Sequence, residues 1–259
     1  MKSISLAMAI HNEEENLTRA LDSVKSLVEE IVIADGASTD RSVDIAKKYK
    51  AKILHADNRK MFHINKQIAI DHCTKKWILQ LDADEVVSKE LRQEIQSLPE
   101  EGNFAGYWMS RRNYFLGKFL QKGGQYPDYT LRLYRNGSGK LPCKSVHEQA
   151  VVSGDTSYLK NSLYHYPYPN FSHYLSHFDR YTSILAQELS ERKVDTGIRE
   201  IISYCVIKPI VWFVKTYVRH KGFMDGFAGF LFSIFSSLRF PVAFVKYWEN
   251  KVSIKDLKT

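Results

Sequence analysis

Three carboxylates follow directly on an apolar run. Asp82, Asp84 and Glu85 come after "WILQL" in the stretch "KKWILQLDADEVV". Hard divalent cations such as Mg²⁺ or Mn²⁺ prefer oxygen ligands, and they usually bind through one or two carboxylates together with substrate phosphates. Residues i and i+2 at the end of a strand can direct two carboxylates at one ion. We therefore interpret Asp82 and Asp84 as a metal and diphosphate site, against the alternative of a solvated turn, and Glu85 as a helix-start carboxylate.

Two further polar positions also follow apolar runs. Asp35 comes after "EIVIA", and a carboxylate at such a strand end can accept hydrogen bonds from a nucleobase or ribose. Asn12 follows "SLAMAIH" and begins the run "NEEEN". The structural interpretation of Asn12 is a helix cap, with the glutamates favoured by the positive end of that helix.

The first hundred residues alternate between strand and helix patterns, which predicts an α/β fold. Strand-like segments are expected at residues 3–10, 30–35, 51–56 and 76–82, with helical spacing between them. Such units imply a parallel sheet with right-handed crossovers and helices on both faces. Ligands of these sheets bind beyond the carboxyl ends of the strands, which is where the polar positions above lie.

The pattern changes in the second half of the chain. Residues 103–165 are expected to form longer antiparallel strands, one of them closed by a turn at Asn136-Gly137. From about Phe171 the chain is predicted to be helical to its end, with Pro209 and Pro241 as breaks or starts.

Charge and cysteine content narrow the class of protein. Residues 192–259 carry 12 Lys and Arg against 5 Asp and Glu, a net +7 of the chain's +8, so the basicity belongs to the C-terminal quarter. No recognisable nucleic-acid-reading module accompanies it, and no nucleic-acid partner is expected. Three widely spaced cysteines favour a reducing cytoplasm, and the N-terminus, which turns acidic after ten residues, indicates no signal peptide.

The basic quarter is also aromatic. Residues 201–248 hold 13 aromatic residues, and their longest uncharged stretch, 226–238, has 13 residues. A membrane-spanning helix needs roughly 20 apolar residues, so the segment is expected to lie in the membrane interface rather than to cross the bilayer. The alternatives are a helical hairpin packed on the core and an oligomer contact.

The order of these motifs closely resembles the GT-A-fold glycosyltransferases of family 2. The resemblance covers "AMAIHNEEENLTRALDSV", "EIVIADGASTDRSVDIA", "NKQIAIDHCTKKWILQLDADE", "GYWMSRRNYFLGKFLQKGGQYPDYTLRLYR" and "VHE", and it continues into the C-terminal helices. The most similar subgroup is the bacterial lipopolysaccharide-core β-1,4-glucosyltransferases. The implied architecture is a Rossmann-like mixed sheet flanked by helices in a catalytic domain, 1–170. Its donor half is about 1–100 and its acceptor half about 101–170, and a membrane-associating helical extension, 171–259, follows.

The resemblance also implies roles for residues of the donor half. Ala9 and Asn12 match the nucleotide-binding first loop, and Asp35 matches the uracil-binding carboxylate. Asp82 is expected to contact the nucleotide-sugar and Asp84 to bind the metal directly. The loop after Asp35 reads "DGASTD" where the family commonly has "DSGSTD" or "DDGSTD", so a second acidic contact to the base is missing here.

An inverting transfer also needs a general base for the acceptor hydroxyl. Glu148 matches the family's His-Glu pair and is the first choice, with a surface salt bridge as its structural alternative. Asp128 is the reserve base, and His147 is expected to orient Glu148 or the acceptor, or to be a structural histidine.

Two kinds of supporting residue complete the expected site. His165 is a possible third metal ligand, with a packed core histidine as the alternative. Lys66, Arg132 and Arg135 are possible partners of the diphosphate or of an anionic acceptor, with solvated strand or helix faces as the alternative.

The resulting hypothesis is a cytoplasmic enzyme bound peripherally to the inner face of the bacterial cytoplasmic membrane. It would be a metal-dependent inverting glycosyltransferase that moves glucose from UDP-glucose to a lipopolysaccharide inner-core sugar. Rival hypotheses are another sugar or another lipid-linked or cell-envelope glycan acceptor, and a non-catalytic membrane-docking protein with a nucleotide-sugar fold. Anionic membrane is an expected partner, and oligomerisation through the C-terminal helices is possible.

Overall fold

The chain folds into two units in the computed structural model, which describes residues 3–58, 61–143, 149–168 and 170–256. Unit 1 comprises Met1–Arg112 and Asp128–His165, and unit 2 comprises Asn113–Pro127 and Tyr166–Thr259. Residues 113–127 therefore belong, by compactness, with the C-terminal helices. The functional boundary at residue 170 stays a prediction.

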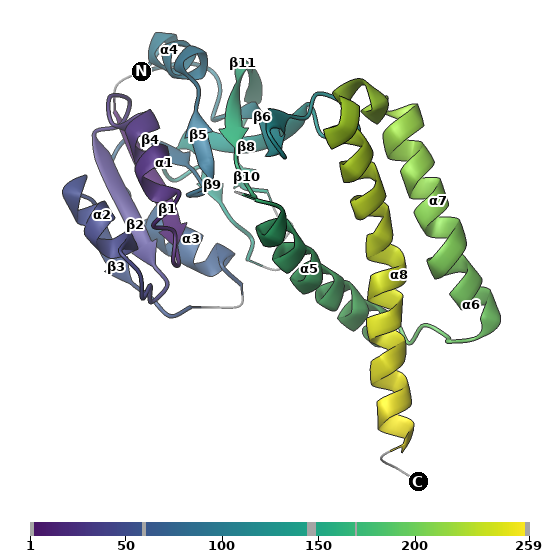
Figure 1. Ribbon diagram of the computed structural model, residues 1–259. Helices are drawn as coiled ribbons and strands as arrows, with labels where there is room; N and C mark the ends of the chain where they lie inside the picture. Colours follow the sequence, from purple (N-terminus) through teal and green to yellow (C-terminus); the bar gives the residue numbers. More distant parts are fainter. Residues whose placement is uncertain (1–2, 59–60, 144–148, 169, 257–259) are drawn as a thin grey trace. The chain divides into compact units, whose positions relative to one another are not determined.

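Unit 1 is built on a mixed sheet with the strand order β3-β2-β1-β4-β8-β6-β11-β5 (Figure 1). The first four strands in this order are parallel, and β8 joins them antiparallel to β4. The strands are β1 (Ile4–Ile10), β2 (Glu30–Asp35), β3 (Lys52–His55), β4 (Trp77–Gln80), β5 (Glu85–Val87), β6 (Gly106–Phe115), β8 (Asp128–Arg135) and β11 (Thr156–His165), with a separate pair, β9 (Gly139–Lys140) and β10 (Val151–Val152). This arrangement confirms the α/β prediction and its antiparallel second half.

Helices cover both faces of the sheet because the strands alternate their side chains between two cores. One core contains Leu6 and Met8 of β1 with the apolar residues of α1 (Leu17–Val24), α2 (Ser42–Lys48) and α4 (Lys89–Ser97). The other contains Ala7 of the same strand with residues of α3 (His63–Asp71). Period-2 alternation in β1 thus assigns large residues to one face and a small residue to the α3 face.

The carboxyl ends of β1, β2 and β4 lie at one edge of the sheet. Ile10 is the register partner of Asp35, and Ala7 is the partner of Gln80, two residues before Asp82. The predicted polar positions therefore follow neighbouring parallel strands, as the rule for open α/β sheets requires.

Unit 2 is mainly helical. It contains β7 (Lys118–Phe119), which pairs with the end of β6, and the helices α5 (Phe171–Glu191), α6 (Ile198–Ile202), η1 (Ser203–Ile207), α7 (Lys208–Phe213), η2 (Val214–Arg219), η3 (Gly222–Asp225) and α8 (Gly226–Asp256). The helical start at Phe171 is confirmed, since Asn170 caps it by accepting a hydrogen bond from His173 N–H. The expectation that Pro241 breaks or starts a helix is wrong, because it lies inside α8.

The segments from α6 to η2 follow one another as one helix, Ile198–Arg219, which we call the α6–η2 helix. This helix (22 residues) and Gly222–Val252 (31 residues) have mean hydropathies of 1.4 and 1.6 and are long and apolar enough to cross a membrane by length and composition. Core helices of soluble proteins pass the same test. The expectation that the tail is too short to span is corrected on this point, because its charged residues interrupt the apolar sequence without ending the helices.

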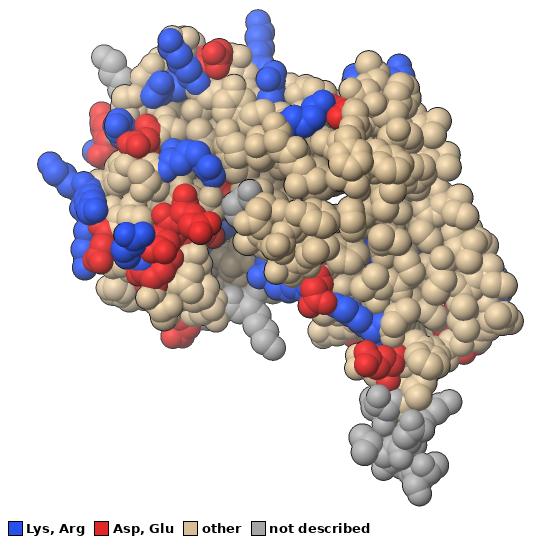
Figure 2. Space-filling model, viewed as in Figure 1, with Lys and Arg blue, Asp and Glu red and all other residues tan. Residues whose placement is uncertain are grey.

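The α6–η2 helix exposes a straight apolar stripe. Six β-branched residues at intervals of four are 45–72% exposed: Ile198, Ile202, Val206, Ile210, Val214 and Val218. In an α-helix of about 3.6 residues per turn, a four-residue repeat drifts by about 40° per interval. Here η1 and η2 are π-helical, with i→i+5 hydrogen bonds and more residues per turn, which offsets the drift. Figure 2 shows a broad surface on the helices of this unit that is almost free of charged side chains.

Candidate active site

The loop after β1 is tied to the loop after β2 by Asn12. Its backbone N–H donates to Ser38 Oγ at 3.0 Å, and its side-chain Oδ1 accepts from Thr39 N–H at 2.8 Å. Asn12 has a φ of 56°, in the left-handed region that asparagine tolerates. The helix it was expected to cap begins only at Leu17, so the capping interpretation is wrong and Asn12 instead shapes the first loop.

Asp35 lies at the end of β2 and is 3% exposed. Its carboxylate accepts from Ser38 N–H at 3.2 Å, and His55 Nδ1 is 3.9 Å from Oδ2. Ala9 of β1 is the register partner of Ala34, directly before Asp35. The structure therefore brings Ala9, Asn12 and Asp35 to one edge, while their contact with a nucleotide stays a prediction.

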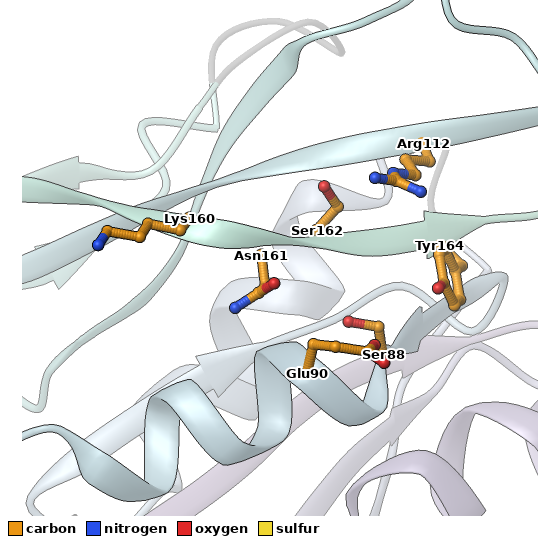
Figure 3. A pocket seen from close by; sticks show the side chains of 7 residues that line it. All are labelled: Ser88, Glu90, Arg112, Lys160, Asn161, Ser162 and Tyr164. Atoms are coloured by element: carbon orange, nitrogen blue, oxygen red, sulfur yellow. The ribbon is translucent and has the colours of Figure 1, made fainter.

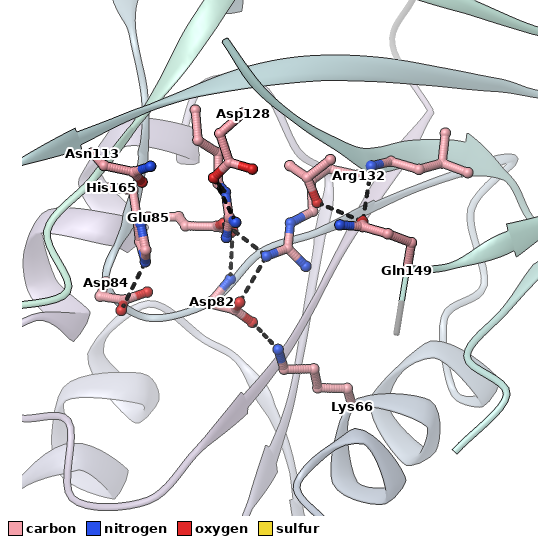
Figure 4. Close-up of polar contacts among 12 residues, drawn as sticks. Lys66, Asp82, Asp84, Glu85, Asn113, Asp128, Arg132, Gln149 and His165 are labelled. Carbon is pink, nitrogen blue, oxygen red and sulfur yellow. Dashed lines mark hydrogen bonds and ion pairs between the residues drawn. The ribbon is translucent and has the colours of Figure 1, made fainter. Parts of the chain in front are cut away.

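Asp82 is held between two cations (Figure 4). Lys66 Nζ is ion-paired with Oδ1, and Arg132 Nη2 donates to Oδ2 at 2.7 Å. Burial opposes ionisation of Asp82, but Arg132 and Lys66 outweigh it, so the pKa of Asp82 lies well below its usual range. Lys66 and Arg132 are 7% exposed, so neither lies on the solvated face proposed as the alternative.

The ion pairs continue from Asp82 as a ladder of alternating charge. Arg132 Nη2 also donates to Glu85 Oε1 at 2.7 Å, and Arg111 Nη1 approaches the same oxygen at 3.3 Å. Arg111 Nε then donates to Asp128 Oδ2 at 3.0 Å. Glu85 is fully buried, and its Oε2 accepts from Asp82 N–H. It begins β5 rather than a helix, so the helix-start interpretation of Glu85 is wrong.

Asp84 has a different environment from Asp82. His165 Nε2 lies 3.3 Å from Oδ2, while Oδ1 is buried and has no hydrogen-bond partner in the part of the chain that the structure describes. Burial raises the pKa of Asp84, but His165 outweighs it, and the net shift is downward. An ionised carboxylate with one unsatisfied buried oxygen fits a hard cation.

A cation here would need ligands beyond these side chains. Within the described ranges, no three His, Cys, Asp or Glu side chains come together as a metal site. Sites for Mg²⁺ commonly use one or two carboxylates, with substrate phosphates and water completing the coordination. The donor set around Asp84 fits that kind of site rather than an all-protein cage.

Glu13 is a titratable neighbour of the two aspartates. Burial raises its pKa from 4.5 to about 7, with Asp84 and Asp82 adding to the rise and a hydrogen bond from Asn16 opposing it. The run "EEE", interpreted as helix-start glutamates, therefore contains one carboxyl group that is half protonated near neutral pH.

Of the two predicted bases, only Asp128 lies among the residues that the structure describes. Glu148 and His147 lie outside the residues that the structure describes. Asp128 lies at the start of β8 with its side chain 33% exposed, paired with Arg111 Nη2 at 2.8 Å. Gln149 is held to β8, since its Oε1 accepts from Thr130 Oγ1 at 2.9 Å.

Arg135 has a structural environment. Its Nη2 donates to Gly102 O at 2.7 Å, its Nε donates to Phe104 O, and its guanidinium lies 5.0 Å from the Trp77 ring. A role of Arg135 in binding diphosphate finds no support in these contacts.

A polar cavity of about 240 Å³ lies elsewhere in unit 1 (Figure 3). It includes none of the predicted site residues, and its lining is Ser88, Glu90, Arg112, Lys160, Asn161, Ser162 and Tyr164. The candidate active site is therefore identified by its ionised side chains at the strand ends and not by this cavity.

Three matches with known proteins agree with this arrangement. Residues 5–152 match the model of the family described as Glycosyl transferase family 2. An uncharacterized glycosyltransferase of Rickettsia typhi is 30% identical over 258 residues, covering 93% of this chain and 85% of the relative. The lipopolysaccharide core biosynthesis glycosyltransferase LpsC of Rhizobium meliloti is 26% identical over 228 residues, covering 85% of this chain and 82% of LpsC.

A solved structure shares the fold. TarS (residues 1–349) of S. aureus, in complex with UDP-GlcNAc, has a TM-score of 0.50 and 15% identity, covering 96% of this chain and 89% of that one. The family model covers more than half of the chain, and the Rickettsia relative aligns with nearly all of it. This chain therefore belongs to glycosyl transferase family 2 and has the GT-A fold.

Proposed function

We propose that the protein is a metal-dependent inverting glycosyltransferase that moves a hexose, glucose from UDP-glucose, to a lipopolysaccharide inner-core sugar. The observation that carries the proposal is the contrast at the end of β4. The buried Oδ1 of Asp82 is ion-paired with Lys66, whereas that of Asp84 has neither an ion pair nor a hydrogen bond among the described residues. The core-biosynthesis relative LpsC supports the acceptor class, and TarS supports a UDP-sugar donor.

The donor end of the site would use residues from three strands. Asp35 accepts hydrogen bonds from the nucleoside, with Ala9 and Asn12 forming the adjoining loop. Asp84, assisted by His165, holds Mg²⁺ or Mn²⁺, which neutralises the departing diphosphate when bound. Asp82 is already occupied by cations, which favours Asp84 over Asp82 as the direct ligand and leaves Asp82 to orient Lys66 and Arg132 toward the diphosphate and sugar.

The acceptor end requires a base that takes the proton of the attacking hydroxyl. Glu148 directly precedes Gln149, which is anchored on β8, and we keep it as the first choice. Asp128 would have to leave its pair with Arg111 in order to act, so it remains the reserve.

The acceptor's lipid anchor would be met by the exposed apolar stripe of the α6–η2 helix. α8 is covered on one side by α5, whose Asp179 pairs with Lys246 of α8 at 2.7 Å. If α8 crossed the bilayer, α5 and its charged residues would be carried into hydrocarbon, at a cost of several kcal/mol for each unpaired charge. A helix lying in the membrane interface on the cytoplasmic side avoids this cost.

The test is UDP-sugar hydrolysis without acceptor, followed by transfer to lipopolysaccharide core acceptors. Across UDP-, GDP- and dTDP-sugars, UDP-glucose should be the sugar hydrolysed in the presence of Mn²⁺ or Mg²⁺. Asp84→Asn should lower this rate at least about 100-fold while leaving the unfolding transition in place. Unchanged hydrolysis in EDTA would sink the metal-dependent proposal. Absence of hydrolysis and of transfer with every donor would favour a non-catalytic docking protein instead.

The same assay separates the two bases. Glu148→Gln should retain UDP-sugar hydrolysis but lose transfer to acceptor, whereas Asp128→Asn should retain both. The reverse result would assign the proton transfer to Asp128.

A further inference from the structure

A cavity of about 220 Å³ in unit 2 is lined by three cationic side chains, Arg192, Lys208 and Arg239. It lies among α5, the first half of the α6–η2 helix and α8. Its apolar lining includes Leu189 and Ala243, which are both buried. The cavity therefore combines concentrated positive charge with a hydrocarbon surface.

Among the residues that the structure describes, no carboxylate is paired with any of the three cations. In the part of the chain that the structure describes, none of Arg192, Lys208 and Arg239 forms an ion pair. Glu188 also lines the cavity, which leaves three positive groups against one negative group. Cations gathered without counter-charges repel one another, and they provide an excess of donors for an anion.

Aromatic rings hold two of these cations in place. Lys208 Nζ lies 3.1 Å from the centroid of the Tyr204 ring, and Arg239 Cζ lies 3.9 Å from that of Trp212. A cation over a ring face is stabilised by the ring quadrupole rather than by a carboxylate. A stacked guanidinium keeps its donors in its own plane, where they suit a phosphate group.

The place of the cavity on the α6–η2 helix suggests the origin of the anion. With four residues per turn, Tyr204 and Lys208 lie opposite the stripe residues Ile202 and Val206. A helix is about 10 Å across, and an interfacial helix buries its apolar face about 5–10 Å into the headgroup and acyl boundary. The opposite face, with the cavity, then lies at the level of lipid phosphates.

We propose that this cavity binds the phosphate group of a membrane lipid, with Lys208 and Arg239 as the principal donors. The inference rests on the membrane contact proposed above. It is independent of sugar transfer, because its site shares no residue with the strand ends of unit 1. It adds a specific anion site to the nonspecific attraction of a basic tail to an anionic surface.

The experiment measures flotation of the full-length protein with phosphatidylcholine vesicles containing either phosphatidic acid or oleate, matched for surface charge. Wild type should bind the phosphatidic acid vesicles about tenfold more tightly. Lys208→Gln and Arg239→Gln should lose this preference, and Lys208→Arg should retain it. Arg219→Gln is the matched control, because it removes a charge from the same helix outside the cavity and away from the Trp212 ring, and it should weaken binding to both vesicles equally.

A soluble arm separates lipid phosphate from free phosphate. Dihexanoyl phosphatidic acid should raise the unfolding temperature of the wild type but not of Arg239→Gln, whereas inorganic phosphate at the same concentration should not. Equal stabilisation by inorganic phosphate would overturn the lipid assignment. Equal binding of the wild type to both kinds of vesicle would refute the proposal that the cavity binds a lipid phosphate. If the wild type then also bound vesicles of pure phosphatidylcholine, the proposed membrane contact of the apolar stripe would still hold.

Discussion

The charge of Asp82 is balanced within the chain by Lys66 and Arg132, and that of Asp84 is only partly balanced by His165. Two aspartates separated by one residue thus have unlike tasks because different strands and helices surround them. In this arrangement Asp82 fixes the positions of two cations, and Asp84 is the group with binding capacity left.

Glu13 should give the folded protein a characteristic pH dependence. Its pKa of about 7 lies above the ordinary 4.5, so the folded state binds more protons at Glu13 than the unfolded state does between these values. Stability from this group is present below pH 4.5 and is lost as pH rises through 7. Glu13→Gln, which retains an acceptor for Asn16, should therefore match the wild type at pH 4.5 and be more stable at pH 8.

The measurement is urea unfolding of both proteins in EDTA between pH 4.5 and 8. Taking the difference between the proteins removes the contribution of other titrating groups. A difference that stays constant over this range would show that Glu13 titrates normally.

Replacing Arg132 alone should lower the unfolding free energy more than replacing Arg132 together with Glu85. Arg132→Met leaves the fully buried Glu85 with Arg111 as its remaining cation, at an expected cost of about 3–5 kcal/mol in unfolding free energy. Glu85→Gln in the same chain removes the surplus charge and keeps an acceptor for Asp82 N–H. The double variant should then be more stable than Arg132→Met, as measured by urea unfolding. If the loss of unfolding free energy in the double variant equals the sum of the losses in the two single variants, the ion-pair ladder is contradicted.

At the scale of single residues, the sequence predicts the acidic residues of the site better than the side chains that pair with them. Asp35, Asp82 and Asp84 were predicted because each follows an apolar strand, a local pattern. Arg111 was missed, and Glu85 was misinterpreted, because their pairing joins β5, β6 and β8, which are distant along the chain. The one available signal is that Arg132 lies between two leucines in "TLRLY", where an unpaired charge would be costly. Arg111 lies in the polar run "SRRN" and gives no such signal.

At the scale of elements, Asp225 links the β7 hairpin to the helices of unit 2. Its side chain is 3% exposed, and its Oδ2 accepts from the backbone N–H groups of Gln121 and Lys122 at 2.9 and 2.8 Å. Lys118 Nζ lies 3.5 Å from Oδ1. One buried carboxylate therefore satisfies two backbone donors of a loop more than 100 residues away.

Removing this carboxylate should loosen the hairpin. Asp225→Ala removes the charged acceptor of these two backbone N–H groups and should destabilise the hairpin by about 1–3 kcal/mol. Asp225→Asn keeps an acceptor oxygen and should cost less. Hydrogen exchange at Gln121 and Lys122 measures the effect directly, with faster exchange expected in the order wild type, Asn, Ala. Equal protection in all three proteins would exclude Asp225 as the anchor.

The sequence predicted whether a segment is a strand or a helix where a single hydrophobic periodicity dominated. The parallel strands of unit 1 and the start of α5 follow from period-2 and period-3.6 patterns with clear boundaries. The four-residue repeat of the α6–η2 helix fits neither period, and only the π-helical segments explain it. Pro241 lies within a long helix whose packing against α5 and α7 offsets the loss of a backbone hydrogen bond.

At the scale of the whole molecule, charge and apolar surface are unevenly distributed. The C-terminal quarter carries nearly all of the net charge, and the same segment holds the exposed stripe. Composition predicted membrane contact, but it could not distinguish residues that face outward from those that pack on α8. That distinction depends on the helical repeat.

The stripe should account for binding to lipid. Val206→Gln with Ile210→Gln keeps the net charge and removes apolar area, and it should weaken binding to phosphatidylcholine/phosphatidylglycerol vesicles at least about tenfold. The matched control is Leu175→Gln with Ile184→Gln, two residues of α5 that are 41% and 40% exposed, and it should bind as the wild type does. Vesicle flotation measures both, and sizing chromatography detects a second copy seated on the stripe. Equal losses in the two double variants would refute the assignment.

The straightness of the stripe has a mechanical consequence. A winding stripe meets a plane at one turn and lets the helix rock, whereas a straight row of six residues meets it along its whole length. Such a row fixes the tilt and the roll of unit 2 against the bilayer, and it leaves lateral diffusion and spinning about the membrane normal. Because the two π-helical segments keep the row straight, they would leave the docked unit only one free rotation, the one about the membrane normal.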